Sequence, residues 1–362
     1  MSATQNRAPK DDARKVGRIL IVRLGSLGDV VHAIPVAAAL RRAFPAARID
    51  WLVSAKHREI LDLVPVIDRR LVINGGQQSG TPSILGAVVE LRRAKYDVAI
   101  DLQGLLKSAV LARSSGAARV VGFATSYLRE RLARPFYTDA YDPGCGGIYD
   151  PRERRHVVDI NLGLLTPLGV QPGVPEYPIE RVDSPIERAL HDRTGGRYAL
   201  LNPGAAWPNK RWPADRLGRL AVALRERYGL TSIALWGEGE QPLADEVVAN
   251  ADGAAIVSPP ASIADLVAMA RGASLVVSGD TGPTHIAGAV GAPLVGIFGP
   301  TRPSRNFPWS GSDVVVSRAD TCECHHLRQC RRPTMCLRDV QVEEVLEAAA
   351  GRLASADRLR RA

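Results

Sequence analysis

The fold of this chain is constrained most by one short segment. In it, an apolar run ends at a glycine turn and is followed by a helical pattern. Ile19–Val22 is the apolar run, Gly25–Gly28 is the turn, and Asp29 and His32 open the helical pattern. The order of strand, tight turn and helix is typical of a buried parallel strand. Open α/β sheets bind their ligands at the carboxyl ends of such strands. Asp29 is therefore expected at a ligand-binding edge, where it either caps the helix or acts as a catalytic base.

Strands and helical patterns alternate in both halves of the chain. This alternation predicts doubly wound parallel sheets, and 362 residues are too many for one ordinary core. The expected strands are Ile19–Val22, Arg48–Val53, Arg70–Ile73 and Val98–Asp101 in the first half, and Tyr198–Leu201, Thr231–Leu235, 255–257, Leu275–Ser278 and Pro293–Phe298 in the second. We therefore predict two similar α/β domains with a ligand-binding cleft between them.

A proline-rich segment, Gln171–Pro185, has the composition of a linker between the two halves. The predicted organisation has four parts: a disordered tail (1–15), an N-terminal domain (16–178), a C-terminal domain (179–340) and a final helix (341–362). The final helix carries apolar residues on one side, at Val342, Val345, Leu346, Ala349 and Leu353.

The chain has a formal net charge of +9, and only six of its 47 basic residues are lysines. Arginine suits phosphates and carboxylates, so acidic small molecules and anionic lipid surfaces are candidate partners; a general bias in composition is the alternative explanation. Nucleic acid is disfavoured, because aromatic residues make up 5% of the chain and no helix-turn-helix or zinc-finger spacing occurs. The N-terminal residues lack the apolar core of a signal peptide and no apolar run is long enough to span a bilayer, so we expect a cytoplasmic protein.

The loop after the predicted strand Leu275–Ser278 has the features of a phosphate site. Its sequence, Gly-Asp-Thr-Gly-Pro-Thr-His (279–285), opens a helix with a proline at the first turn. The N–H groups and the dipole of such a turn attract an anion, and Thr281 and Thr284 could add hydroxyl donors. The alternative is a plain strand-to-helix turn that is capped by Asp280 or Thr281.

Two further loops of the second half carry charged side chains at strand ends. Lys210, beside Arg211, could neutralise a leaving diphosphate, or it could be a solvated charge before a helix. In the loop Trp236–Glu240, Glu240 could accept hydrogen bonds from ribose hydroxyls, or it could favour a helix start. No dinucleotide-binding fingerprint, phosphate-binding P-loop or metal-binding Asp-x-Asp occurs. These absences disfavour nicotinamide, flavin and NTPase functions.

Several segments, taken in order, resemble the bacterial lipopolysaccharide heptosyltransferases of glycosyltransferase family 9, and most of all the heptosyltransferase I group. They are ILIVRLGSLGDVVHAIPV at the N-terminus, DLQGLLKSA (101–109), LRERLARPFY (128–137), NKRWP (209–213) and SGDTGPTHIAGAVGAPLVGIFGPT (278–301). The resemblance covers nearly the whole chain, and its last segment is the most specific.

The resemblance implies a GT-B fold, in which two Rossmann-like domains face a central cleft. The N-terminal domain would take the acceptor, the C-terminal domain the nucleotide sugar, and the final helix would cross back to the first domain. The implied reaction is an inverting, metal-independent transfer of L-glycero-D-manno-heptose from ADP-heptose to the Kdo sugar of Kdo2-lipid A, with no cofactor, on the inner face of the inner membrane. Another family 9 transferase (second heptose or a different sugar) and a catalytically silent nucleotide-sugar-binding protein remain alternatives.

The resemblance also implies roles for individual residues. Asp29 would be the catalytic base, and Lys210 would stabilise the leaving diphosphate. The remaining donor-binding candidates are Asn209, Arg211, Glu240, Asp280, Thr281, Gly282 and His285. The acceptor-binding candidates are Ser26, Gly28, His32, Lys107, Arg129 and Arg131, with His32 placed to hydrogen-bond Asp29.

Four cysteines, at positions 322, 324, 330 and 336, cluster with His325 and His326. Their spacing differs from that of a standard zinc ribbon. Reduced structural thiols or a redox-sensitive loop are favoured over a metal site, for which Cys322, Cys324, Cys330 and Cys336 are the candidate ligands.

Overall fold

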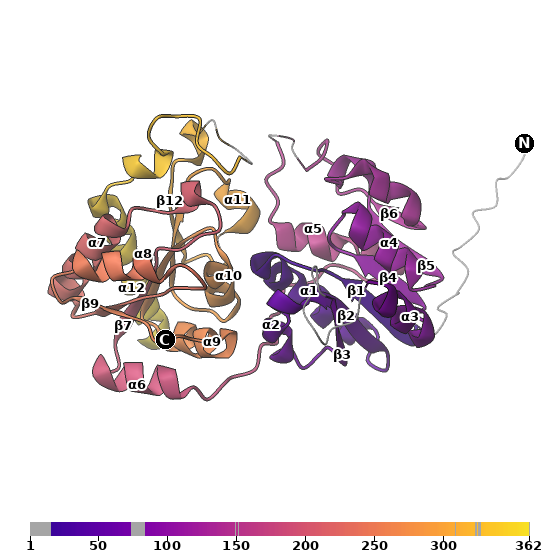
Figure 1. Cartoon of the computed structure of the whole chain (residues 1–362), viewed down its shortest axis with the longest axis horizontal. Coiled ribbons are helices and arrows are strands. Elements are labelled where there is room, and N and C mark those ends of the chain that lie inside the picture. The colour runs from indigo at the N-terminus through magenta and orange to yellow at the C-terminus, as the bar shows by residue number, and fades with distance from the viewer. Residues whose placement is uncertain are drawn as a thin grey trace, which may run out of the picture.

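The computed structural model describes residues 16–73, 84–148, 150, 152–307, 309–322, 324 and 327–361. The predicted tail 1–15 and the histidines at 325 and 326 lie outside these residues. The described chain forms two α/β domains side by side, each built on a six-stranded parallel sheet (Figure 1). The predicted alternation of strands and helices is therefore confirmed in both halves.

The first sheet has the order β3-β2-β1-β4-β5-β6. Its strands are β1 (Arg18–Val22), β2 (Arg48–Ser54), β3 (Arg69–Ile73), β4 (Val98–Asp101), β5 (Arg119–Phe123) and β6 (Asp139–Tyr141). Its helices are α1 (Leu27–Ala43), α2 (Glu59–Asp62), α3 (Ile84–Ala94), α4 (Leu106–Ser114) and α5 (Val157–Gly163). Ile21 of the central strand β1 pairs with Trp51 on one side and with Ile100 on the other. The chain order reverses between β1 and β4, which is the point where doubly wound sheets bind ligands.

The second sheet repeats this plan with the order β12-β11-β10-β7-β8-β9. Its strands are β7 (Tyr198–Asn202), β8 (Thr231–Ala234), β9 (Ala255–Val257), β10 (Leu275–Gly279), β11 (Leu294–Phe298) and β12 (Val314–Ser317). Its helices are α6 (Pro185–Arg193), α7 (Ala214–Tyr228), α8 (Gln241–Ala249), α9 (Ile263–Gly272), α10 (Gly282–Ala289), α11 (Pro303–Asn306) and α12 (Val342–Arg361). Here the reversal falls between β7 and β10, so the loops that follow these two strands are brought together.

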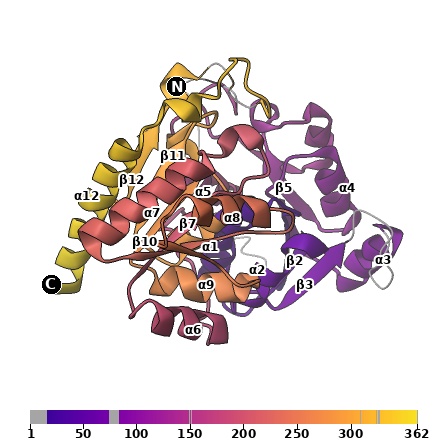
Figure 2. The same ribbon diagram turned by 60° about the vertical axis from the view of Figure 1, so that its left-hand side comes forward.

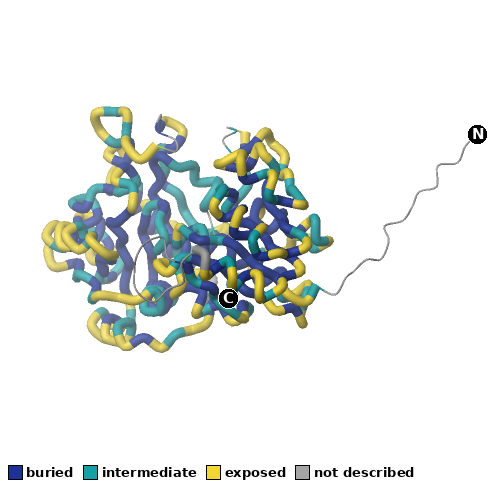
Figure 3. The backbone as a smooth tube through the Cα atoms, turned by 45° about the vertical axis from the view of Figure 1, so that its right-hand side comes forward, coloured by how far each residue is buried: buried dark blue, intermediate teal, exposed yellow. Residues whose placement is uncertain are grey.

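The inner strands of both sheets are buried along most of their length, whereas the edge strands β3, β6, β9 and β12 are mostly half-buried, and exposed residues gather in the outer loops, turns and helix faces (Figure 3). Helix α1 is buried on nearly all sides. It packs on the first sheet and on α5, and it also contacts α10 of the second domain. Ile286 and Ala289 of α10 belong to the same apolar cluster as the first core. The helix that carries Asp29 therefore lies at the contact between the domains.

The chain crosses between the domains just after the predicted boundary at 178/179. Ile179 is still part of the first core, and the Glu180 amide donates to the Leu63 carbonyl over 2.9 Å. Arg271 of α9 donates to the carbonyls of Ile179 and Glu180, over 2.6 Å in both cases. The linker is thus hydrogen-bonded to both domains.

The prediction that the final helix crosses back to the first domain is wrong. Helix α12 packs on α7 and on β12 and β11 of the second domain (Figure 2). Val345 and Ala349 of its apolar side are fully buried in the core that also contains Leu217 of α7. The apolar stripe is real, but it covers the second sheet. No helix among the described residues is both long and apolar enough to cross a membrane.

Candidate active site between the domains

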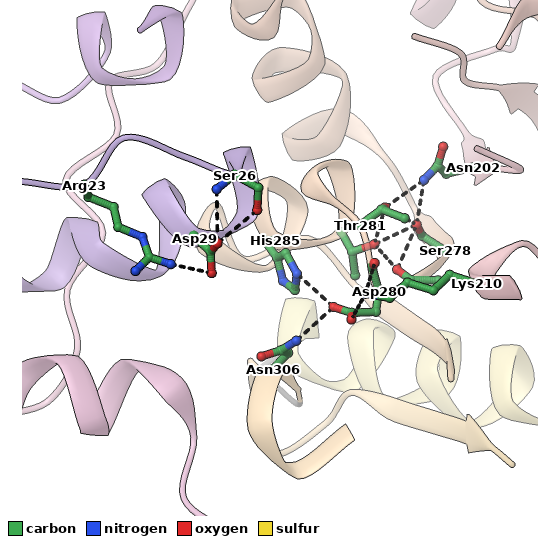
Figure 4. Close-up of polar contacts among 12 residues, drawn as sticks. Arg23, Ser26, Asp29, Asn202, Lys210, Ser278, Asp280, Thr281, His285 and Asn306 are labelled. Carbon is green, nitrogen blue, oxygen red and sulfur yellow. Dashed lines mark hydrogen bonds and ion pairs between the residues drawn. The ribbon is translucent and has the colours of Figure 1, made fainter. Parts of the chain in front are cut away.

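Asp29 lies at the start of α1, just beyond the carboxyl end of β1. Its Oδ2 accepts hydrogen bonds from the Ser26 amide (3.0 Å) and the Ser26 hydroxyl (3.1 Å), and its Oδ1 forms an ion pair with Arg23 at 2.7 Å (Figure 4). The carboxylate thus closes the helix start, as one sequence interpretation predicted. About a third of the side chain, 31%, stays accessible. Because Asp29 is held by its neighbours yet reachable, capping and proton acceptance are compatible roles.

The surroundings of Asp29 favour its charged form. Burial on its own would raise the pKa of this carboxyl, but the Arg23 charge, the Ser26 amide and the Arg129 charge outweigh it and hold the pKa below the usual value. The exposed acceptor candidate Arg129 therefore lies within electrostatic reach of Asp29. Arg305 of α11 interacts with the charges of Asp29, Arg129 and Arg23, and burial lowers its pKa. Arginines from both domains thus surround the Asp29 carboxylate, and their positive charges suit an anionic substrate.

On the second domain, Asp280 forms the centre of a buried polar group after β10. Its Oδ2 is 2.5 Å from Lys210 Nζ, and its Oδ1 contacts His285 Nε2 at 3.2 Å and Asn306 Nδ2 at 3.0 Å (Figure 4). Burial would raise the pKa of Asp280, but the His285 hydrogen bond and the Lys210 charge hold it well below the usual value. Three candidates, Lys210, Asp280 and His285, are therefore in direct contact.

The Thr281 hydroxyl and the Lys210 ammonium link the loop after β7 to the loop after β10, and we call these two joined loops the donor loop. Asn202 Nδ2 donates to Thr281 Oγ1 over 2.9 Å and to Ser278 Oγ over 3.0 Å, and Thr284 Oγ1 donates to Ser278 Oγ over 2.7 Å. Thr281 makes no capping bond to α10, and Asp280 binds Lys210 instead. Thr281 occupies the N-cap position, as the plain-turn interpretation predicted, but neither its side chain nor that of Asp280 satisfies the N–H groups at the helix start. The N-terminus of α10 therefore remains suited to an anion.

Close contacts at two glycines bring the sites of the two domains together. A Cβ added at Gly28 would lie 2.4 Å from His285 Cδ2, and one at Gly282 would lie 2.8 Å from Leu27 Cδ2. The candidates Gly28 and Gly282 therefore allow the starts of α1 and α10 to approach each other. Gly28 thus contacts the donor loop, and the remaining acceptor candidates Lys107 and Arg131 are exposed on the first domain.

The other donor candidates have different surroundings. The Arg211 guanidinium lies 3.7 Å from Glu240 Oε1 and donates through Nε to the Ala205 carbonyl over 2.8 Å. Gly204 leaves room for the Glu240 carboxylate, because a Cβ there would lie 2.1 Å from Oε2. Asn209 is buried and donates to the Leu327 carbonyl over 2.9 Å. Glu240 is thus partly accessible but paired with Arg211, whereas Asn209 supports the loop from behind.

His32 does not hydrogen-bond Asp29, so that prediction is wrong. Both of its ring nitrogens are buried, and neither has a hydrogen-bond partner among the described residues. The ring instead stacks on Trp309, at 5.2 Å between centroids and 13° between planes, and it lies 4.3 Å from the His285 ring. His156, at the N-cap of α5, lies 5.7 Å from His32 and 5.8 Å from Trp309. We call His32, His156, His285 and Trp309 the ring cluster; it joins the two domains behind Asp29.

Sequence reasoning missed Arg23, Arg305, Asn306, His156 and Trp309. Arg23 was detectable in principle, because it follows β1 directly and a cation there faces the start of α1. The other four come from loops and helix starts far from Asp29 in the sequence. Only tertiary packing, within the first domain for His156 and between the domains for the other three, brings them to the site.

Two parallel-sheet domains contact each other here, one with an accessible carboxylate and the other with a half-buried lysine beside a helix start that suits an anion. This fold and site define a glycosyltransferase with the GT-B fold. The family model of glycosyltransferase family 9 (heptosyltransferase) matches residues 87–335. The chain is 32% identical over 313 residues to lipopolysaccharide heptosyltransferase 1 of Pseudomonas aeruginosa, which covers 84% of this chain and 85% of that protein. The chain therefore belongs to glycosyltransferase family 9, the lipopolysaccharide heptosyltransferases.

Solved structures agree with the fold. The family 9 glycosyltransferase of Veillonella parvula aligns with a TM-score of 0.77 at 24% identity, covering 94% of this chain and 99% of that one. The E. coli heptosyltransferase WaaC with ADP aligns with a TM-score of 0.69 at 23% identity, covering 93% and 99%. The expected GT-B architecture is thus confirmed.

Proposed function

We propose that this glycosyltransferase transfers L-glycero-D-manno-heptose from ADP-heptose to the Kdo sugar of Kdo2-lipid A. The observation that carries the proposal is the placement of Asp29 against the loop of Lys210, Asp280 and His285, with Gly28 in contact with His285. Family membership supports a heptose donor and a lipopolysaccharide acceptor. A structure of E. coli WaaC with an ADP-fluoroheptose is consistent with an ADP-linked donor.

Asp29 takes the proton of the attacking hydroxyl in this mechanism. The acceptor oxygen forms a bond to the anomeric carbon of heptose while the bond from that carbon to the diphosphate oxygen breaks. The hydroxyl proton moves to a carboxylate oxygen of Asp29, which its surroundings keep ionised. A single displacement with one base inverts the anomeric centre.

Lys210 and the N-terminus of α10 stabilise the leaving ADP. Both provide positive potential where the negative charge of the diphosphate develops. Asp280 fixes Lys210 at 2.5 Å and so limits the positions of its ammonium group. Since these groups can neutralise the diphosphate, we propose that transfer needs no divalent metal. Glu240, beside Arg211, is placed to accept a ribose hydroxyl.

The arginines around Asp29 support an anionic acceptor. Arg23 neutralises the charge of Asp29, so Arg129 and Arg305 add positive charge beyond that pair. The Kdo carboxylate is an anion of suitable size. We further propose that the chain, with its net charge of +9, acts at the inner face of the inner membrane through electrostatic contact alone. Binding to anionic vesicles should then be lost at high salt.

The test is a transfer assay with ADP-heptose and Kdo2-lipid A, with and without EDTA, and with GDP- and UDP-sugars as controls. We expect product only from ADP-heptose, and equal product when EDTA is added together with the substrates, which removes exchangeable Mg²⁺ but leaves no time to extract a thiolate-bound ion. An acceptor that already carries one heptose is tested in parallel. Product from this acceptor but not from Kdo2-lipid A would assign the chain to a second-heptose transferase. ADP binding without product from any of these donors would indicate a silent nucleotide-sugar-binding protein.

A further inference from the structure

Four cysteine side chains gather beside the donor loop and form a cluster of their own. Cys322, Cys324 and Cys336 are buried, and Cys330 packs against them. The Sγ atoms of Cys324 and Cys330 are 3.4 Å apart, and the Cys322 and Cys336 thiols are hydrogen-bonded to each other. All four are free thiols. We call the described residues 322, 324 and 327–336 the cysteine segment.

Backbone amides point at the sulfur atoms. The Arg331 amide donates to Cys324 Sγ over 2.9 Å, and the Cys324 amide donates to Cys322 Sγ over 3.3 Å. A neutral thiol is a weak acceptor, whereas hydrogen bonds of this kind stabilise the thiolates that bind a metal. The amide geometry therefore suits sulfur ligands better than inert thiols.

The cluster contains no apolar side chain other than cysteine among its buried members. Between the 3-10 turns Ala319–Thr321 and Cys336–Asp339, the described residues form no helix or strand. Within the described part of residues 322–336, Cys322, Cys324 and Cys336 are the only buried side chains, so contacts between sulfur atoms make up the interior of this segment. Sulfur ligands about 2.3 Å from Zn²⁺ lie about 3.8 Å apart in a tetrahedron, whereas a disulfide joins sulfurs at about 2.05 Å. The observed 3.4 Å is the contact distance of two hydrogen-bonded thiols and lies within about 0.4 Å of the spacing that a tetrahedral site requires.

The cysteine segment holds the donor loop from behind. The Leu327 amide donates to the Cys324 carbonyl over 3.0 Å, and the Leu327 carbonyl accepts from Asn209 over 2.9 Å. The Arg328 guanidinium lies 5.8 Å from the centre of the Trp207 ring, and Lys210 Nζ lies 4.7 Å from the same centre. A change in the cysteine segment would therefore reach Lys210 through its immediate neighbours.

We propose that Cys322, Cys324, Cys330 and Cys336 bind one thiophilic divalent cation, with Zn²⁺ as the fitting example, and that this site positions the donor loop. The four thiols form two close pairs. Within the described residues, no three His, Cys, Asp or Glu side chains already have the geometry of a metal centre. Binding therefore draws the two pairs together and releases the thiol protons to solvent. The second part of the proposal, on the donor loop, rests on the proposed function.

The metal content of the purified full-length chain tests the site without any activity assay. We expect about one equivalent of zinc by elemental analysis, and its loss in Cys324→Ser and Cys330→Ser. The matched control is Cys145→Ser, because Cys145 is an exposed free thiol outside the cluster. Reconstitution with Co²⁺ should give the intense thiolate-to-cobalt absorption of a tetrahedral site. Iron in place of zinc, lost in the same variants, would also support a four-thiolate site.

Less than a tenth of an equivalent of zinc and iron together, in protein purified without chelator, would overturn the proposal, as would a disulfide between any two of the four cysteines. The Cys330→Ser variant is expected to fold, because Cys330 is only partly buried, and circular dichroism would check its fold.

ADP titration calorimetry tests the second part of the proposal, the positioning of the donor loop. We expect at least fivefold weaker ADP binding in folded Cys330→Ser and no change in Cys145→Ser. Metal loss with unchanged ADP affinity would overturn the positioning role alone.

Discussion

Arg23 and Ser26 hold opposite oxygens of the Asp29 carboxylate, with the Arg23 guanidinium 2.7 Å from Oδ1 and the Ser26 amide 3.0 Å from Oδ2. The ion pair and the helix start therefore fix the orientation of the carboxylate before any substrate binds. This preorganisation comes with a lowered pKa, so Asp29 is ionised at neutral pH but is a weaker base than a free carboxylate.

Asp29→Asn should abolish transfer while leaving the donor site intact. An amide cannot take the hydroxyl proton, so kcat should fall by about two to four orders of magnitude. ADP affinity, measured by calorimetry, should stay within about twofold, because Asp29 has no contact with Lys210 or Asp280. Transfer at the wild-type rate would exclude Asp29 as the base.

Arg23→Met should move the acid limb of the kcat/KM profile to higher pH. Removing the guanidinium removes the main cause that lowers the Asp29 pKa, whereas burial, which raises it, remains. The ionised form is then lost at a higher pH than in the wild type. Arg113→Met, at an exposed position on α4, is the matched control and should leave the profile unchanged. An unshifted acid limb in Arg23→Met would show that Asp29 does not control it.

Lys210→Met should reduce both transfer and stability. The Lys210 and Asp280 side chains are only 16% and 4% exposed, so the variant leaves a buried carboxylate without its cation. Breaking such a pair costs about 3 kcal/mol of unfolding free energy. The double variant Lys210→Met/Asp280→Asn should recover much of this stability in urea denaturation but not the transfer rate. Recovery of both would show that Lys210 has no role with the diphosphate.

Local sequence patterns were enough to predict nine strands of the two sheets and the donor loop, but they missed β5, β6 and β12. Strand, turn and helix follow one another within a few residues, so the position of Asp280 and Thr281 at the end of β10 follows from the chain itself. The two interpretations of Asp29 also proved compatible, because the Ser26 amide and an incoming hydroxyl need different parts of one carboxylate.

Contacts between distant segments were beyond sequence reasoning. His32 is one turn from Asp29, which suggested a hydrogen bond, but its ring faces Trp309 and His285 of the other domain. The apolar stripe of α12 showed that the helix is covered on one side but not which domain covers it. In both cases the deciding partner is fixed by tertiary packing.

The ring cluster should make the protein less stable in mild acid. Burial, together with the charges of His285 and His156, holds the pKa of His32 well below 6.5, and burial likewise lowers the pKa of His156. In unfolded chains these rings take up protons near pH ~6.5, so the unfolded state binds more protons just below that pH. The unfolding free energy should therefore fall as pH drops from 7 to 5, by at most about 1.4 kcal/mol per pH unit for each ring.

His32→Phe tests this origin, since it keeps a ring against Trp309 and removes the titrating nitrogens. Urea denaturation from pH 5 to 7 should show a shallower pH dependence than in the wild type. His191→Phe, at an exposed position on α6, should keep the wild-type slope. Equal slopes in all three proteins would place the acid sensitivity elsewhere.

Arg352→Met should destabilise the second domain strongly, because α12 is part of its core. Arg352 Nε lies 3.1 Å from Asp313 Oδ1, and the two side chains are only 6% and 1% exposed. The Oδ2 atom of Asp313 accepts from the amides of Trp309 (3.1 Å) and Ser310 (2.8 Å), so the pair also supports the loop of the ring cluster. Removing the cation should lower the free energy of unfolding by about 3–5 kcal/mol.

The matched control is Arg219→Met, which breaks an exposed pair with Asp215 and should change the free energy of unfolding by less than about 1 kcal/mol. If α12 instead packed on the first domain in solution, Arg352 would be free of Asp313 and the two variants would unfold at the same urea concentration.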